Sequence, residues 1–170
     1  MNKQYYISEA KRAANIQINE LKKIKKIFNK SFIKAVDLIL NCKGKIIFAG
    51  IGKSGLIARK ISATFSSVGI PSFFCDPAQA LHGDMGQIEK KDILIIFSYS
   101  GNTSELTNMI KYANRYSIKI IGIASKPDSI LLKASDIKLI LPKVKESDVT
   151  GMVPTSSTST VSYTHLRAHE

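Results

Sequence analysis

Two loops in the sequence contain residues of the types that hold a phosphate. The first is GIGKSG at residues 50–55, which follows the apolar run KIIFA and has the spacing G-x-G-x-x-G. The second is SYSGNTSE at 98–105, which is rich in hydroxyl groups and precedes a helical pattern. Thr103 or Ser104 would cap that helix, whose N-terminus is suited to an anion. Together with the hydroxyl run PTSSTST at 154–160, these loops predict a cradle for a phosphorylated small molecule.

The glycine loop alone would also fit two kinds of nucleotide site. A P-loop for a nucleoside triphosphate needs G-x-x-x-x-G-K-[ST], and Ile47 occupies the position of its first glycine, so we reject this alternative. A dinucleotide site has the right strand-to-helix position, with Asp76 placed to bind a ribose hydroxyl. Lys53 is unusual inside that fingerprint, and a nicotinamide site does not need the second loop. A nicotinamide-dependent oxidoreductase is therefore the weaker alternative.

The periodicity of the apolar residues predicts the elements that position these loops. Helical patterns cover 4–29, 31–41, 54–69 and 103–117, with a short helix after residue 125. Apolar runs predict five strands, at 45–50, 70–75, 92–98, 118–125 and 137–142. Nearly continuous apolar strands that alternate with helices indicate an α/β fold, a doubly wound five-stranded parallel sheet with helices on both faces. Ligands of such sheets bind outside the carboxyl ends of the strands.

Composition and charge exclude several classes of partner. The chain has 170 residues, 44% of them hydrophobic, but no apolar run of the roughly 18–20 residues that span a membrane. The N-terminus lacks the apolar core of a signal peptide. Cys42 and Cys75 have no metal-type spacing, which favours a reduced, cytoplasmic protein without a metal site. The net charge of +12 comes largely from dispersed lysines, and no nucleic-acid motif accompanies them, so we expect neither nucleic acid nor membrane as a partner.

Five motifs, in the order GIGKSG, PSFF, HGD, SYSGNTSE and PTSS, closely resemble those of the sugar isomerase (SIS) domain. Within that superfamily the chain looks like the arabinose-5-phosphate isomerase branch of lipopolysaccharide biosynthesis, over roughly residues 5–160. The resemblance implies a five-stranded parallel sheet and the interconversion of D-arabinose 5-phosphate and D-ribulose 5-phosphate without a required cofactor. It also implies a homo-oligomer, for which the long N-terminal helix is a candidate interface.

The resemblance further implies roles for individual residues. Glu146 would move a proton between C1 and C2 through an enediol, Lys53 would stabilise the enediolate, and His82 would contact the sugar hydroxyls or assist ring opening. The expected substrate-binding residues are Gly52, Ser54, Gly69, Ile70, Ser98, Ser100, Gly101, Asn102, Thr103, Ser104, Glu105, Thr155, Ser156 and Ser157. Simpler alternatives are a phosphate partner for Lys53, a structural hydrogen-bond partner for His82 and a surface charge for Glu146.

Two positions depart from the pattern of the family. Many members carry a catalytic glutamate where this chain has Asn102, and an amide cannot act as a base. This loss favours a non-catalytic SIS-type sensor of sugar phosphates, although sensors usually carry a helix-turn-helix ahead of the domain, for which 1–41 is too short and wrongly patterned. Some members have a histidine at the position of Asp76 that helps bind an inhibitory zinc, so zinc sensitivity is not expected to carry over.

The resemblance ends after about residue 160. The tail VSYTHLRAHE has no apolar face and resembles a foreign junction on a truncated gene, so the pair His165 and His169 is not expected to hold a metal. The predicted organisation is an N-terminal helical segment at 1–41 that packs on the domain, an α/β domain at 42–160 that is incomplete at its C-terminus, and a non-native tail at 161–170.

Overall fold

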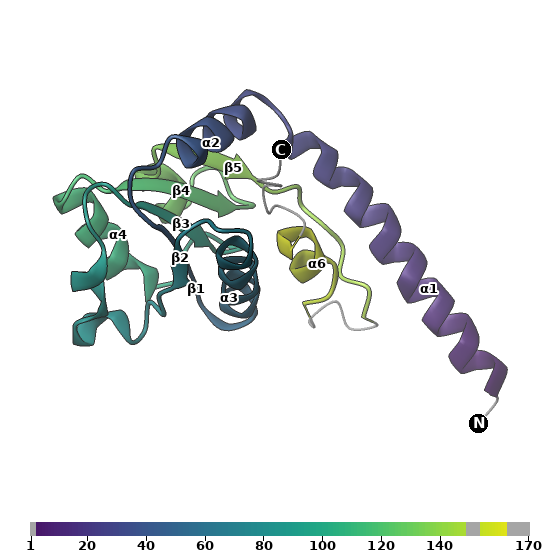
Figure 1. Ribbon diagram of the computed structural model, residues 1–170. Coiled ribbons are helices and arrows are strands. Elements are labelled where there is room, and N and C mark those ends of the chain that lie inside the picture. The colour runs from purple at the N-terminus through teal and green to yellow at the C-terminus, as the bar shows by residue number, and fades with distance from the viewer. Residues whose placement is uncertain (1–2, 149–153, 163–170) are drawn as a thin grey trace.

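A five-stranded parallel sheet in the order β2-β1-β3-β4-β5 forms the centre of the molecule (Figure 1). The structure is a computed structural model that describes residues 3–148 and 154–162, so the predicted tail lies almost wholly outside the described residues. The strands are β1 (Ile46–Gly50), β2 (Ser72–Phe74), β3 (Ile93–Phe97), β4 (Lys119–Ala124) and β5 (Ile137–Ile140). Every residue of β1 and β3 is buried, as expected for central strands covered on both faces. The predicted α/β fold is confirmed.

Helices connect the strands and precede the sheet. They are α1 (Lys3–Leu21), α2 (Lys30–Leu40), α3 (Gly52–Ser67), α4 (Leu106–Arg115), α5 (Ile130–Ala134) and α6 (Ser156–Ser162). Short 3₁₀ segments cover Lys22–Ile27, Ala80–His82 and Asp84–Gln87. The helix predicted at 4–29 is therefore two elements, because the α-helix gives way to a 3₁₀ segment after Leu21.

The alternation of side chains along the strands divides the core into two layers. Ile46 and Phe48 point to the face that α2, α3 and α6 cover. The alternate residues of the same strand, Ile47 and Ala49, point to the opposite face, which α4 and α5 cover. Because α3 follows β1 and α4 follows β3, the loops after these neighbouring strands diverge to opposite faces. That divergence makes the carboxyl ends of β1 and β3 the switch point of the sheet, where doubly wound proteins bind ligands.

The glycines of the first loop bring α3 close to β1. A Cβ atom at Gly55 would lie 2.6 Å from the carbonyl oxygen of Gly50, so only glycine permits this approach. Gly52 has a φ of 58°, a backbone conformation that favours glycine. The G-x-G-x-x-G spacing therefore has a packing explanation that requires no ligand.

Helix α1 lies apart from the sheet. Figure 1 shows it beyond α6, which separates it from α3. None of its residues is buried, although the 3₁₀ segment after it contributes Ile24 and Ile27 to the core. Within the described part of the chain, no helix combines the length and the apolar character needed to cross a membrane.

Candidate functional site

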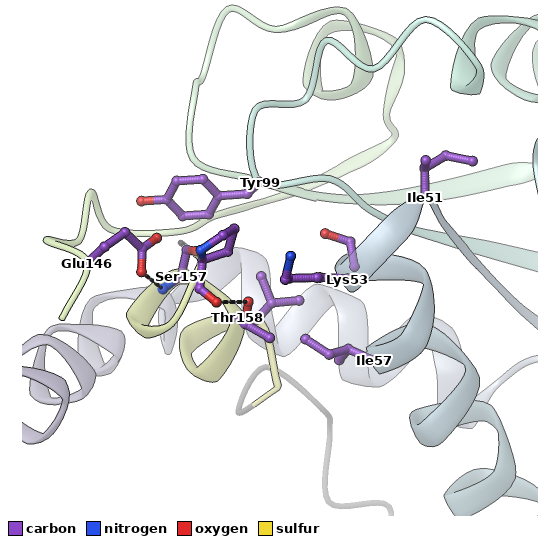
Figure 2. A pocket seen from close by; sticks show the side chains of 10 residues that line it. Ile51, Lys53, Ile57, Tyr99, Glu146, Ser157 and Thr158 are labelled. Carbon is purple, nitrogen blue, oxygen red and sulfur yellow. Dashed lines mark hydrogen bonds between the residues drawn. The ribbon is translucent and has the colours of Figure 1, made fainter. Parts of the chain in front are cut away.

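A cavity of about 340 Å³ opens beside the carboxyl end of β1 (Figure 2). It is lined by Ile51, Lys53, Ser54, Ile57, Tyr99, Glu146, Pro154, Ser157, Thr158 and Val161. Its volume lies in the range of small-molecule sites, about 300–1,000 Å³. Lys53 reaches it from α3, Tyr99 from the loop after β3 and Glu146 from the segment after β5. Two of the three predicted catalytic residues therefore line the same cavity.

The first turn of α3 forms the electropositive side of the cavity. The N-cap residue, Ile51, offers no side-chain acceptor to the N–H groups of this turn. These groups and the helix dipole give the N-terminus a partial positive charge. Lys53 adds a full charge, and none of the ion pairs found among residues 3–148 and 154–162 involves it. This side of the cavity is suited to an anionic group.

Glu146 is fixed on the opposite side by the residues that begin α6. Its Oε2 accepts hydrogen bonds from the backbone N–H of Thr155 (2.7 Å), from Thr155 Oγ1 (3.0 Å) and from the backbone N–H of Ser157 (3.3 Å). Burial works to raise the pKa of Glu146, but the hydrogen bonds from Ser157 and Thr155 outweigh it and hold the pKa below the usual 4.5. Glu146 is therefore an oriented carboxylate, ionised at neutral pH.

Tyr99 lines the cavity and is bonded to its Glu146 side, and the sequence analysis missed it. Its hydroxyl oxygen accepts a hydrogen bond from the backbone N–H of Val144 at 3.1 Å, which ties the loop after β3 to the segment that carries Glu146. Its carbonyl oxygen accepts bonds from the N–H and the hydroxyl of Ser125. The available signal was its position, two residues after a buried strand at the ligand-binding edge.

The loop 98–105 is compact and holds itself together. Ser98 is buried, and its Oγ lies 2.9 Å from Thr103 Oγ1 and accepts a bond from the backbone N–H of Gly101. Gly101 has a φ of 70°, and a Cβ atom there would lie 2.2 Å from Ser129 Oγ, so the position requires glycine. Apart from Tyr99, no residue of this loop lines the 340 Å³ cavity.

The predicted cap of α4 is wrong. The N-cap residue is Glu105, without a side-chain hydrogen bond to the helix. Thr103 and Ser104 serve through their carbonyl oxygens, which accept bonds from Leu106 and Thr107 in a tight first turn. Their hydroxyls have other partners, since that of Thr103 pairs with Ser98 and that of Ser104 donates to the Glu105 carboxylate.

Asn102 and Ser100 have local roles in this loop. Asn102 Oδ1 accepts a bond from the backbone N–H of Ile130 at 2.9 Å. Ser100 Oγ accepts from the backbone N–H of Asn102 at 3.3 Å. The amide that replaces the expected glutamate therefore binds the N–H of the first residue of α5, whose N-cap is Ser129.

Of the predicted site residues, Lys53, Ser54, Glu146 and Ser157 line the cavity, and the others do not. His82 is exposed in the 3₁₀ segment after β2 and does not line it. Gly69 and Ile70 close the C-terminus of α3 through bonds to the carbonyls of Ser66 and Phe65. Because they precede β2, they lie at the amino edge of the sheet, opposite the carboxyl ends where the cavity opens. In this chain Gly69 and Ile70 end a helix away from this cavity, and their role in substrate binding stays a prediction.

A second cavity, of about 220 Å³, lies on the other side of the glycine loop. It is lined by Asp76, by Arg59, whose guanidinium lies 4.4 Å from the centre of the Phe74 ring, and by Gly50 and Gly52. Asp76 Oδ1 accepts a bond from the backbone N–H of Ala78 at 3.0 Å. The volume is below the usual range even for drug-sized ligands, so this cavity adds no support to a dinucleotide site.

The family follows from a comparison of the whole chain with known proteins. The model of the SIS domain matches residues 39–168. The chain belongs to the SIS domain family. Arabinose 5-phosphate isomerase KdsD of Escherichia coli K12 is 40% identical over 139 residues, which are 82% of this chain and 42% of that protein. Arabinose 5-phosphate isomerase GutQ of the same strain is 39% identical over 143 residues, which are 84% of this chain and 44% of that protein.

A solved structure of a related protein has the same fold. The protein c3406 of Escherichia coli CFT073, solved in complex with arabinose 5-phosphate, superposes with a TM-score of 0.90 at 31% identity and covers 96% of this chain and 87% of that one. The SIS chain described here spans less than half the length of the curated relatives above.

Proposed function

We propose that this SIS domain binds a sugar phosphate and that, in the whole protein, it interconverts D-arabinose 5-phosphate and D-ribulose 5-phosphate. The observation that carries the proposal is the placement of Lys53 and Glu146 around one cavity at the switch point of the sheet. Support comes from relatives at about 40% identity that are named arabinose 5-phosphate isomerases, and from a neighbour solved with arabinose 5-phosphate. The product would enter lipopolysaccharide (Kdo) precursor synthesis.

The reaction needs a base at the carbon and a positive group near the oxygen. Glu146 is ionised and oriented by the bonds that its Oε2 accepts, and its carboxylate would take up the proton that moves between C1 and C2. Lys53 and the first turn of α3 would stabilise the negative charge that develops on the enediolate oxygen. The phosphate group of the sugar is expected to lie against the hydroxyl-rich segments 98–105 and 154–160. His82 does not line the cavity, so it would have to reach the sugar from outside the cavity.

A non-catalytic sugar-phosphate sensor is the second candidate. Asn102 favours it, because its amide supplies no base and its Oδ1 already accepts the N–H of Ile130 in α5. Cytoplasmic location, a homo-oligomer and the division of the chain at about residues 41 and 160 remain predictions that accompany either candidate.

The test measures conversion and binding together. D-arabinose 5-phosphate is added to this chain and to a chimera that continues with the C-terminal part of KdsD, and D-ribulose 5-phosphate is assayed alongside calorimetric binding. Glu146→Gln should lower kcat by about 10²–10⁴-fold and leave binding in place. The matched control is Glu89→Gln, which makes the same change at an exposed residue beside Asp92, at the amino edge of the sheet.

Each outcome discriminates between the candidates. Conversion that Glu146→Gln abolishes and Glu89→Gln spares supports the isomerase. Binding without conversion in either protein supports the sensor. Conversion at the normal rate in Glu146→Gln removes the proposed base, and the absence of both binding and conversion removes both candidates.

A further inference from the structure

Helix α1 is joined to the loop of Glu146 by a directional series of hydrogen bonds. Gln17 Nε2 donates to Ser147 Oγ at 3.0 Å, across 130 positions of the sequence. Ser147 Oγ donates to Thr155 Oγ1 at 2.9 Å, and Thr155 Oγ1 donates to Glu146 Oε2 at 3.0 Å. Each hydroxyl in the series accepts a bond from the group before it and donates to the group after it, and the series ends on a carboxylate. Hydrogen bonds in such a chain polarise one another and strengthen together.

The middle of this series is shielded from water. Ser147 is 3% exposed, and its backbone N–H also donates to Thr155 Oγ1 at 2.8 Å. Gln17 is half-buried, and its Oε1 lies 3.5 Å from Ser159 Oγ of α6. Because Ser147 is almost wholly shielded from solvent, its hydroxyl depends on protein groups such as Gln17 for hydrogen bonds.

The bonds of α1 to this region are polar. None of the residues of α1 is buried, and its last residue, Leu21, packs against the edge of the core. Next to Gln17, Glu20 Oε2 accepts a bond from the backbone N–H of Lys145 at 3.0 Å, one residue before Glu146. Two polar residues on consecutive turns of α1 thus hold the segment that carries the carboxylate.

We infer that Gln17 is a positioning residue, which orients Glu146 through Ser147 and Thr155 and strengthens the donor that Glu146 receives. The inference rests on the proposed role of Glu146 as the proton-transfer base. It assigns α1 a function in the site although the helix does not line the cavity. Loss of the amide donor leaves Ser147 and Thr155 as weaker donors, while Glu20 still holds the backbone of Lys145 to α1.

The charged groups near Glu146 also influence its titration. Lys53 lies across the cavity, and Lys145 precedes Glu146 in the chain. Glu20 faces the loop from α1 and is paired with Lys23. A neutral substitution at position 17 changes none of these charges, so a change in the titration of Glu146 reports the hydrogen bonds.

The experiment follows the side-chain carboxyl of Glu146 by carbon-13 NMR during a pH titration, with the signal assigned by Glu146→Gln. Gln17→Met keeps the length of the side chain and removes the donor. It should shift the titration midpoint of Glu146 upward. Asn19→Leu makes a comparable change at an exposed residue of the same helix and should leave the midpoint unchanged. Ser147→Ala should raise the midpoint by itself, and Gln17→Met should add nothing in that background.

The outcomes separate this inference from the proposed function. The positioning role is overturned if Glu146 titrates in Gln17→Met with the wild-type midpoint. It is also overturned if Gln17→Met shifts the midpoint of Glu146 as much in the Ser147→Ala variant as in the wild type. The expected shifts in a protein without isomerase activity would retain the positioning role and remove the proposed function. In an active protein, Gln17→Met should lower kcat, by up to about 10²-fold for a misplaced base, with little change in KM.

Discussion

Asn102 Oδ1 accepts a hydrogen bond from the backbone N–H of Ile130 at 2.9 Å, so the loop after β3 is tied to the first turn of α5. A second bond, from the N–H of Leu131 to the carbonyl of Gly101, reinforces this contact. The hydroxyl loop therefore takes its shape from α5 as well as from α4, and Asn102 is central to it.

Asn102→Ala should lower the free energy of unfolding by about 1 kcal/mol, the typical value of one such bond. Asn102→Asp keeps the acceptor oxygen and places a negative charge at a helix N-terminus, so it should remain within about 0.5 kcal/mol of the parent. Urea unfolding measures both, with Asn108→Ala as a control at an exposed position of α4. Equal stabilities for Asn102→Ala and Asn102→Asp would show that the amide oxygen does not matter.

The hydroxyl of Thr155 should control the titration of Glu146. Thr155→Val removes the Oγ1 donor and keeps the shape, so the pKa of Glu146 should rise from its lowered value and the acid limb of kcat should move to higher pH. Thr158→Val is the matched control, because Thr158 lines the same cavity and bonds to the carbonyl of Pro154. Identical pH profiles for the two variants would contradict the assignment.

The same bonds link stability to pH. A carboxyl group whose pKa is lower in the folded than in the unfolded protein stabilises the fold at any pH above its pKa in the unfolded protein. This stabilisation is lost as the pH falls through the pKa of the group in the folded protein. Glu146→Gln should therefore reduce the free energy of unfolding at pH 7, and its difference from the parent should shrink below about pH 4.5. A difference that stays constant from pH 7 to pH 3 would argue against the lowered pKa.

Much of the fold was accessible from the sequence because the apolar pattern is strong. Runs such as KIIFAG and DILIIFS are too uniformly apolar for half-exposed strands, and the glycines that follow β1 allow the close approach of α3. The boundaries were less accurate. The helix predicted from residue 103 begins at Leu106, because the hydroxyls of Thr103 and Ser104 bond to other side chains and do not cap it.

The site was only partly accessible, for a physical reason. The roles of Lys53 and Glu146 were implied by the resemblance to the SIS family, and the structure places both residues at one cavity. Tyr99 and Gln17 act through hydrogen bonds between segments far apart in the chain, and nothing in the periodicity of α1 distinguishes Gln17 from its polar neighbours. Gly69 and Ile70 could be assigned to the amino edge of the sheet only once the end of α3 was known.

Cys75 should be unreactive and Cys42 reactive in the folded protein. Burial, with Asp84 and Asp76 nearby, raises the pKa of the Cys75 thiol to about 11, so at pH 8 only about one molecule in a thousand carries the thiolate that reacts. Cys42 is half-buried. A disulfide reagent should therefore label one thiol quickly and the second only on unfolding. If the Cys42→Ala variant still reacted quickly with the reagent, the fast reaction would belong to Cys75, and the burial of Cys75 would be contradicted.

Lys53 offers the sharpest separation between catalysis and phosphate binding. If it stabilises the enediolate, Lys53→Met should lower kcat by about 10²-fold, as for the loss of one donor to a developing oxyanion, while the Kd for the sugar phosphate changes by less than about threefold. If it pairs only with the phosphate, the Kd should instead rise by about 10-fold or more, because a charge-assisted bond is lost. We expect the first result, since Lys53 shares its cavity with Glu146 and the hydroxyl loop at 98–105 contributes only Tyr99 there. Lys60→Met, at an exposed position two turns further along α3, is the control and should change neither constant.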